Sequence, residues 1–125
     1  MKKAIAILAT LAMALTSAPS ASAHAQLQIG FPKPGSVAKI WPTQIWVEFD
    51  GDLIQLGGSK VNQLTIKDSA GKIVETKPSV VSGAQLSVET IKPAKSGKVS
   101  VMWRVVSEDG HPVSHSYTFF YIPKR

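Results

Sequence analysis

Short segments in which apolar and polar residues alternate are the feature that most restricts how this chain can fold. The longest is KVSVMWRVVS, and one of its faces carries Val99, Val101, Trp103 and Val105. Alternation with a period of two, in β-branched and aromatic residues, is typical of a strand with one buried face. Four more segments alternate in a similar way: QIWVEF, VNQLTIKD, AQLSVET and SHSYTFFYI.

Turn-forming pairs separate these segments. Asp50-Gly51, Ser82-Gly83 and Asp109-Gly110 are examples, and each supplies a residue that tolerates a positive φ. No stretch has a convincing helical period. About seven short strands within one domain therefore predict an all-β fold, a β-sandwich of immunoglobulin-like size.

The first 23 residues have the features of a secretory signal peptide. A basic start, Met1-Lys2-Lys3, precedes an apolar run from Ala4 to Leu15, and Ala21-Ser22-Ala23 forms a small-x-small cleavage site. The run is too short for a spanning helix, which needs about 20 apolar residues. The sequence predicts cleavage after Ala23 and a single exported domain over residues 24–125. An uncleaved amino-terminal anchor is the alternative.

Composition excludes several classes of function. The chain has no cysteine, which rules out thiolate metal sites, disulfides and a cysteine nucleophile. The net charge is +6, but the lysines are scattered and do not interleave with aromatic residues, so we expect no nucleic-acid partner. No second apolar run of spanning length follows the first, and we expect no stable membrane insertion after cleavage.

The histidines are candidate metal ligands. Cleavage after Ala23 would make His24 the first residue, and its α-amine and ring Nδ1 can then chelate one ion. Near the other end, SEDGHPVSH holds Asp109 and His111 around a turn. Three nitrogens and one oxygen suit tetragonal Cu(II), while Zn²⁺ accepts similar ligands in a tetrahedron. The alternative is that His24 is an ordinary surface residue and Asp109-Gly110 an ordinary turn.

Two stretches resemble the CopC family of exported copper-binding proteins. They are HAQLQIGFPKPGSV, directly after the predicted cleavage site, and VMWRVVSEDGHPVSHSYTFFY. The resemblance covers essentially all of residues 24–125. It implies a small Greek-key β-sandwich or barrel, immunoglobulin-like or cupredoxin-like. It also implies one Cu(II) ion per chain, held by the amine and ring of His24, by Asp109 and by His111.

The same resemblance implies a function. We expect a periplasmic or secreted copper(II) carrier, buffer or chaperone in copper homeostasis or resistance, not an enzyme. A membrane copper transporter of the CopD type is the partner that it implies. Protons compete for the amine and the rings, so we expect acid to release the metal.

Two positions depart from the family pattern. His115 stands where the family more commonly has a small residue, often Gly. It is either an extra ligand, a hydrogen-bonding partner of a ligand, or a solvent-facing strand residue. Some members also hold Cu(I) in a methionine-rich stretch, but Met102 is the only methionine after the predicted signal peptide. We therefore expect no Cu(I) methionine site.

The residues are also compatible with two other functions. An amino-terminal histidine chelate with a second histidine also describes the copper brace of polysaccharide monooxygenases. Those domains are usually much larger, and Asp109 would fill a position that oxygen chemistry needs open. The other alternative is a metal-free immunoglobulin-like interaction module. Copper titration and a polysaccharide-cleavage assay separate the three.

Overall fold

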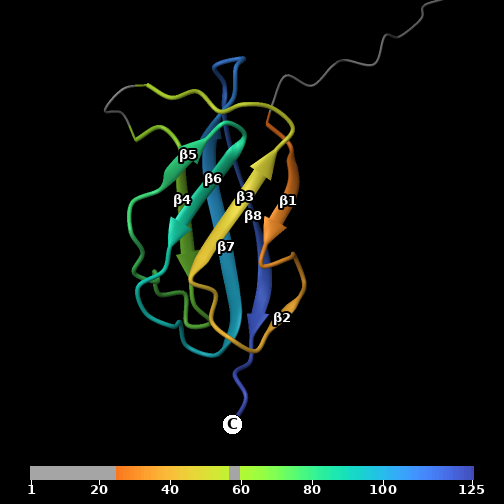
Figure 1. Cartoon of the computed structure of the whole chain (residues 1–125), viewed down its shortest axis with the longest axis vertical. Coiled ribbons are helices and arrows are strands. Elements are labelled where there is room, and N and C mark those ends of the chain that lie inside the picture. The colour runs from red at the N-terminus through yellow and green to blue at the C-terminus, as the bar shows by residue number, and fades with distance from the viewer. Residues whose placement is uncertain (1–24, 57–59) are drawn as a thin grey trace, which may run out of the picture.

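The chain folds into a two-layer β-sandwich (Figure 1). The computed structural model describes residues 25–56 and 60–125, and every element in these two ranges is a strand. The strands are β1 (Leu27–Phe31), β2 (Val37–Ala38), β3 (Gln44–Phe49), β4 (Gln63–Lys67), β5 (Val80–Ser82), β6 (Gln85–Glu89), β7 (Gly97–Val106) and β8 (Pro112–Tyr121). The predicted all-β sandwich is confirmed.

The strands divide into two sheets of four. One has the order β1-β3-β6-β5 and the other β2-β8-β7-β4. Neighbouring strands are antiparallel, except that β2 runs parallel to β8. The chain crosses from one sheet to the other after β1, β2, β3, β4 and β6, so each sheet combines segments that are far apart in the sequence.

The core lies between the sheets and follows the alternation of the sequence. The inward residues of β3 and β7 are at most 5% exposed: Ile45, Val47, Phe49, Val99, Val101, Trp103 and Val105. Phe119 of β8 is fully buried, and the rings of Phe49 and Trp103 meet edge-on with centroids 5.9 Å apart. These contacts join the two layers, and the apolar core stabilises the fold without any disulfide.

A bulge interrupts the alternation of β1. Leu27 is opposite Phe49, but Ile29 is opposite Glu48, so β1 has one extra residue there. After the bulge, Gly30 faces inward against Tyr117, where an added Cβ would lie 2.8 Å from the phenol oxygen. The phenol donates to the carbonyl of Pro32 at 2.8 Å, which ties β1 to β8 across the open side of the sandwich.

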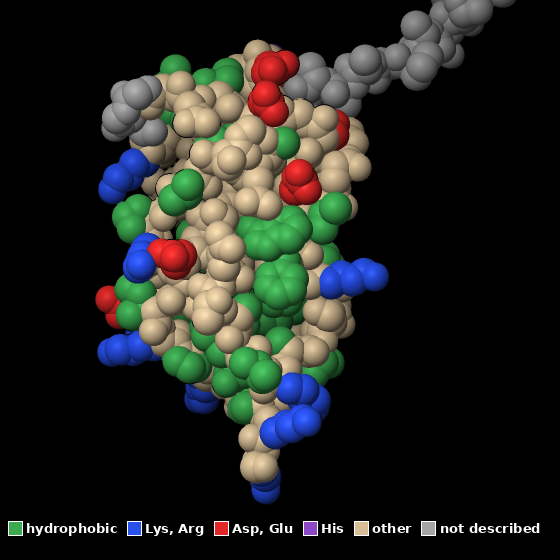
Figure 2. All heavy atoms as spheres, viewed as in Figure 1, with side chains coloured by type: hydrophobic (Ala, Val, Ile, Leu, Met, Phe, Trp, Pro, Cys, Tyr) green, Lys and Arg blue, Asp and Glu red, His purple; other side chains and the backbone are tan. Residues whose placement is uncertain are grey.

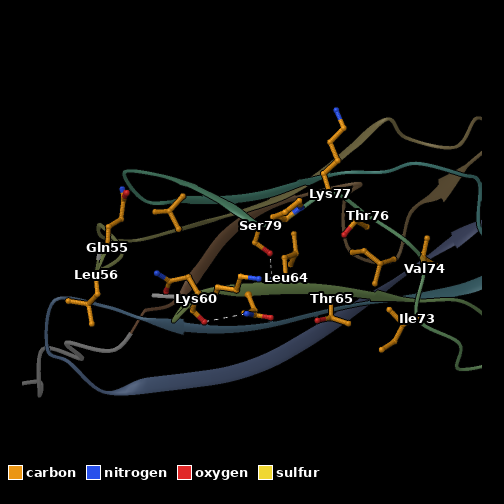
Figure 3. Close-up of a pocket in the computed structure, with 15 residues that line it drawn as sticks. Gln55, Leu56, Lys60, Leu64, Thr65, Ile73, Val74, Thr76, Lys77 and Ser79 are labelled. Carbon is orange, nitrogen blue, oxygen red and sulfur yellow. Dashed lines mark hydrogen bonds between the residues drawn. The ribbon is translucent and has the colours of Figure 1, made fainter. Parts of the chain in front are cut away.

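The opposite side of the sandwich, between β4 and β5, has a cleft of about 570 Å³ (Figure 3). Within it, the amide of Leu64 donates to the hydroxyl of Ser79 at 3.0 Å, and the amide of Val74 donates to the carbonyl of Ile66 at 2.8 Å. The outer edge of β4 is therefore partly capped. Within the described ranges, no helix has the length and apolar character to cross a membrane.

Candidate metal centre

The turn between β7 and β8 presents the two carboxyl-terminal candidate ligands. β7 and β8 stay paired up to Val106 and Pro112, so residues 107–111 form a tight connection. Gly110 has a φ of +78°, and its amide donates to the carbonyl of Ser107 at 2.9 Å. A positive φ of this kind favours glycine, which explains the Asp-Gly pair.

Asp109 and His111 lie side by side on this turn. Asp109 Oδ2 is 3.3 Å from His111 Nδ1, and Asp109 Oδ1 accepts the backbone amide of His111 at 3.0 Å. The carboxylate is largely buried, with 12% of its side chain exposed, whereas the imidazole is 71% exposed. If Nδ1 carries the proton and donates it to the carboxylate, Nε2 takes the unprotonated form that a metal requires.

Ser107 forms a hydrogen bond with the carboxylate of Asp109. Its hydroxyl donates to Asp109 Oδ1 at 2.8 Å, and the residue is only 5% exposed. The S-x-D spacing in SEDGH is the local pattern that could have identified this contact, because serine and aspartate often bond two residues apart in turns. The sequence analysis did not single out Ser107.

A second support comes from Asn62, far away in the sequence. Its amide oxygen accepts the backbone amide of Val106 at 2.8 Å, and its amide nitrogen donates to the carbonyl of Ile54 at 2.6 Å. Asn62 is 7% exposed, so both bonds are shielded from water. It thereby fixes the last residue of β7, and no local pattern in the sequence predicts this role.

The amino-terminal segment reaches the same end of the sandwich. Figure 1 shows residues 25–26, which precede β1, at the end of the sandwich that carries the turn between β7 and β8. The amide of Gln26 donates to Asp50 Oδ1 at 3.0 Å, and the amide of Asp50 donates back to the carbonyl of Gln26 at 3.0 Å. Ala25 is 7% exposed. His24 itself lies outside the described residues.

His115 is placed on β8, directly across from Trp103 of β7. The two rings meet edge-on with centroids 5.8 Å apart, and His115 is exposed. Within residues 25–56 and 60–125, no three His, Asp or Glu side chains form a group that could hold a metal ion. The described part of the chain therefore groups Asp109 with His111 without a third His, Asp or Glu that would complete a metal site. Met102 lies on the outer face of β7, 36% exposed.

Carboxylates are concentrated at the end that carries the turn. Asp50, Asp52 and Glu108 join Asp109 there, and Figure 2 shows acidic side chains toward this end of the visible face. Such a distribution attracts cations toward the turn. The cleft of Figure 3 is a separate feature, because none of its lining residues belongs to the turn.

Comparison with known proteins agrees with the motifs. A family model described as the CopC domain matches residues 27–121. Copper resistance protein C of Pseudomonas syringae pv. tomato is 31% identical over 103 residues, which cover 79% of this chain and 81% of that protein. Copper resistance protein C of Escherichia coli is 30% identical over 105 residues, with 80% of this chain and 82% of that protein covered.

Two solved structures share the fold. CopC from Methylosinus trichosporium OB3b superposes with a TM-score of 0.68 at 26% identity, covering 82% of this chain and 97% of that one. PcoC from Escherichia coli, described as a methionine-rich copper resistance protein, has a TM-score of 0.65 at 23% identity, covering 80% and 100%. The likeness to PcoC supports the sandwich alone.

Proposed function

This chain belongs to the CopC family, and from that premise we propose that it binds one Cu(II) ion outside the cytoplasm and carries or buffers it. Family membership indicates a copper-related function and argues against an enzyme. The observation that carries the Cu(II) proposal is the pairing of Asp109 with His111 in one turn, with 3.3 Å between Oδ2 and Nδ1.

The proposed ligands are the α-amine and ring of His24, the carboxylate of Asp109 and the ring of His111. Support for His24 comes from its neighbours, since Gln26 is bonded twice to Asp50 at the end that carries the turn. The donor set would contain three nitrogens and one oxygen, the combination that suits tetragonal Cu(II). Cleavage after Ala23 creates the amine, so export and the metal site are linked.

The residues around the turn would order the ligands before copper arrives. Ser107 and the amide of His111 both donate to Asp109 Oδ1, which restricts rotation of the carboxylate. A preordered ligand loses less conformational freedom on binding. With Met102 as the only methionine outside residues 1–23, we propose no thioether Cu(I) site.

The cellular setting is part of the proposal. The signal-peptide features of residues 1–23 support a periplasmic or secreted chain, and the relatives are named copper resistance proteins. A membrane copper transporter of the CopD type is the proposed recipient of the ion. Whether the chain serves resistance or supply follows from whether its loss sensitises cells to excess copper or to copper limitation.

The first prediction concerns the amino terminus. Cu(II) titration against a competing chelator should give one tight site for protein that begins at His24. One added residue before His24 should weaken binding by at least about tenfold, because losing even an outer partner of a metal ligand costs about that much. The sequence change is minimal and lies outside the sandwich, so loss of folding does not explain the effect.

Two histidine variants complete this experiment. His111→Ala should lose tight binding, whereas His115→Ala, its matched control, should keep one Cu(II) per chain and the same copper spectrum. Equal affinity for the native and extended amino termini would contradict the proposed site. Loss of tight binding in His115→Ala would instead add that residue to the ligands.

A further inference from the structure

The end of the sandwich opposite the 107–111 turn includes three segments that lie together. They follow β2, precede β7 and follow β8: residues 39–43, 90–96 and 122–125. The amide of Ile122 donates to the carbonyl of Ala38 at 3.0 Å. The amide of Thr90 donates to the carbonyl of Thr43 at 3.0 Å. These bonds make the three segments one surface, which we call the basic end.

Each of the three segments exposes an isoleucine. Ile40 is 85% exposed, Ile91 49% and Ile122 46%. Ile40 is the most exposed large hydrophobic side chain in the described residues. Single exposed apolar residues are ordinary, but three from separate loops at one end form a repeated feature.

Cations surround the isoleucines. All of the lysines and the arginine in the three segments are exposed: Lys39, Lys92, Lys95, Lys124 and Arg125. The segments contain no Asp or Glu. In Figure 2 the lower tip of the visible face carries basic and apolar side chains and no acidic ones.

Three carboxylates lie beside the basic end, and one of them, Glu89, directly precedes Thr90 and pairs with Lys77 at 2.7 Å. The carbonyl of Glu75 accepts the amide of Ile91 at 3.4 Å, which places Glu75 at one flank. Asp68 lies near Ser69, whose hydroxyl donates to the carbonyl of Ser96. Asp68 already accepts two backbone amides through Oδ1. The five cations of the basic end outnumber these three flanking acids, so the end keeps an excess of positive charge.

We propose that the basic end adsorbs to an anionic phospholipid surface. The isoleucines would enter the headgroup layer while the lysines and arginine pair with lipid phosphates, the combination by which peripheral proteins hold membranes. The apolar side chains protrude from three loops and do not line a groove. This arrangement suits insertion into a deformable headgroup layer. Within residues 25–56 and 60–125, no segment spans the bilayer in this arrangement.

Adsorption would set the orientation of the molecule. β7 and β8 are ten residues each and run from the basic end to the 107–111 turn. At about 3.3 Å per residue, they hold the turn roughly 30 Å from the surface. The turn would therefore face the surrounding solution while the chain is bound. The inference is independent of copper, because no proposed ligand belongs to the basic end.

Vesicle sedimentation tests the proposal with the metal-free chain that begins at His24. It should pellet with phosphatidylcholine vesicles containing phosphatidylglycerol and not with phosphatidylcholine alone, and added salt should release it. Lys39→Glu and Lys92→Glu should each lower partitioning by about fivefold or more. Ile40→Ser should lower it by a similar factor.

The matched controls change the same residue types elsewhere. Lys60→Glu and Leu56→Ser alter exposed residues outside the basic end and should leave partitioning within about twofold of the parent. Equal losses in the controls, or no adsorption to anionic vesicles, would overturn the proposal. The protein could also bind immobilised polyglutamate as well as it binds anionic vesicles, with no loss of that binding in Ile40→Ser. This result would identify an acidic protein as the occupant and would also overturn the proposal.

Orientation gives a second, independent readout. Because the chain has no cysteine, Ser96→Cys and Gln55→Cys can each carry one environment-sensitive dye. The dye at residue 96 should shift to the blue on anionic vesicles, while the dye at residue 55 should not. The reverse result would place the wrong end on the lipid. Adding Cu(II) should change neither result. The membrane proposal and the copper proposal can therefore be contradicted independently of each other.

Discussion

At the scale of the residue, Asp109 is the side chain on which the proposed site depends. It is largely buried, and three contacts from its own turn fix it: the hydroxyl of Ser107, and the amide and ring of His111. A buried carboxylate needs such donors because burial without hydrogen bonds is costly. The same donors that stabilise the turn would thus set the direction from which Asp109 meets a metal.

Removing the serine hydroxyl tests this dependence. Ser107→Ala should lower Cu(II) affinity by about tenfold, because Asp109 loses the donor that orients it. Competition with a chromogenic copper chelator measures the change. Ser114→Ala, an exposed serine on β8, is the control and should bind as the parent does. Parent-like affinity in Ser107→Ala would show that the hydroxyl serves the turn and not the metal.

Tyr117 gives the fold a dependence on high pH. Its burial raises the pKa of the phenol above the usual value of 10.0. The folded chain therefore keeps this proton at a pH where the unfolded chain releases it. The resulting stability is fully present below about pH 10 and is lost as the pH rises further.

Urea unfolding from pH 9 upward measures this effect. The parent should lose stability above about pH 10 more steeply than Tyr117→Phe, which has no proton to lose. Tyr121→Phe is the control, and its curve should parallel the parent. Identical slopes for the parent and Tyr117→Phe would contradict the assignment. The phenylalanine variant should also be less stable by about 1 kcal/mol, since the bond to Pro32 is gone.

At the scale of the element, β1 shows how one extra residue changes a strand. The bulge between Leu27 and Ile29 turns Ile29 and Phe31 outward and Gly30 inward. Phe31 then stacks on Trp46 on the outer face, with ring centroids 6.1 Å apart. The inward glycine leaves the space that the ring of Tyr117 occupies. β1 can therefore pack closely against β8 at this point.

Substituting Gly30 tests this fit. Gly30→Ala should destabilise the fold by about 1–3 kcal/mol, because the added Cβ overlaps the ring of Tyr117. Gly51→Ala is the matched control, since nothing lies within 4 Å of a Cβ built there. Thermal and urea unfolding compare the two. A parent-like Gly30→Ala would show that the Tyr117 ring can move aside at no cost.

The sequence predicts five of the strands and misses the other three for physical reasons. β3, β4 and β7 alternate between buried and more exposed residues because one face of each packs on the core, and β6 and β8 keep enough of this pattern to be recognised. The bulge breaks the alternation of β1, as described above. β2 and β5 have two and three residues, too few to show a period at all.

At the scale of the whole molecule, the two ends of the sandwich differ in charge. Carboxylates gather near the 107–111 turn and cations at the basic end (Figure 2).

The spacing D-x-H is local, so the sequence could predict that Asp109 and His111 lie together. The contacts of Asn62 with β7 and of Asp50 with Gln26 join segments that are 44 and 24 residues apart. Such contacts depend on the path of the chain between sheets, which alternation does not encode. The contribution of His24 stays a prediction.

The sheet edges have a consequence for how copies of the chain coexist. An exposed edge with unpaired amides and carbonyls is a template on which another strand can add, which leads to aggregation. Here the edge strands β2 and β5 are very short. On the edge strand β4, the Ser79 hydroxyl accepts the amide of Leu64, and the amide of Val74 donates to the carbonyl of Ile66. One serine side chain thus helps to keep neighbouring molecules from joining their sheets in a crowded compartment.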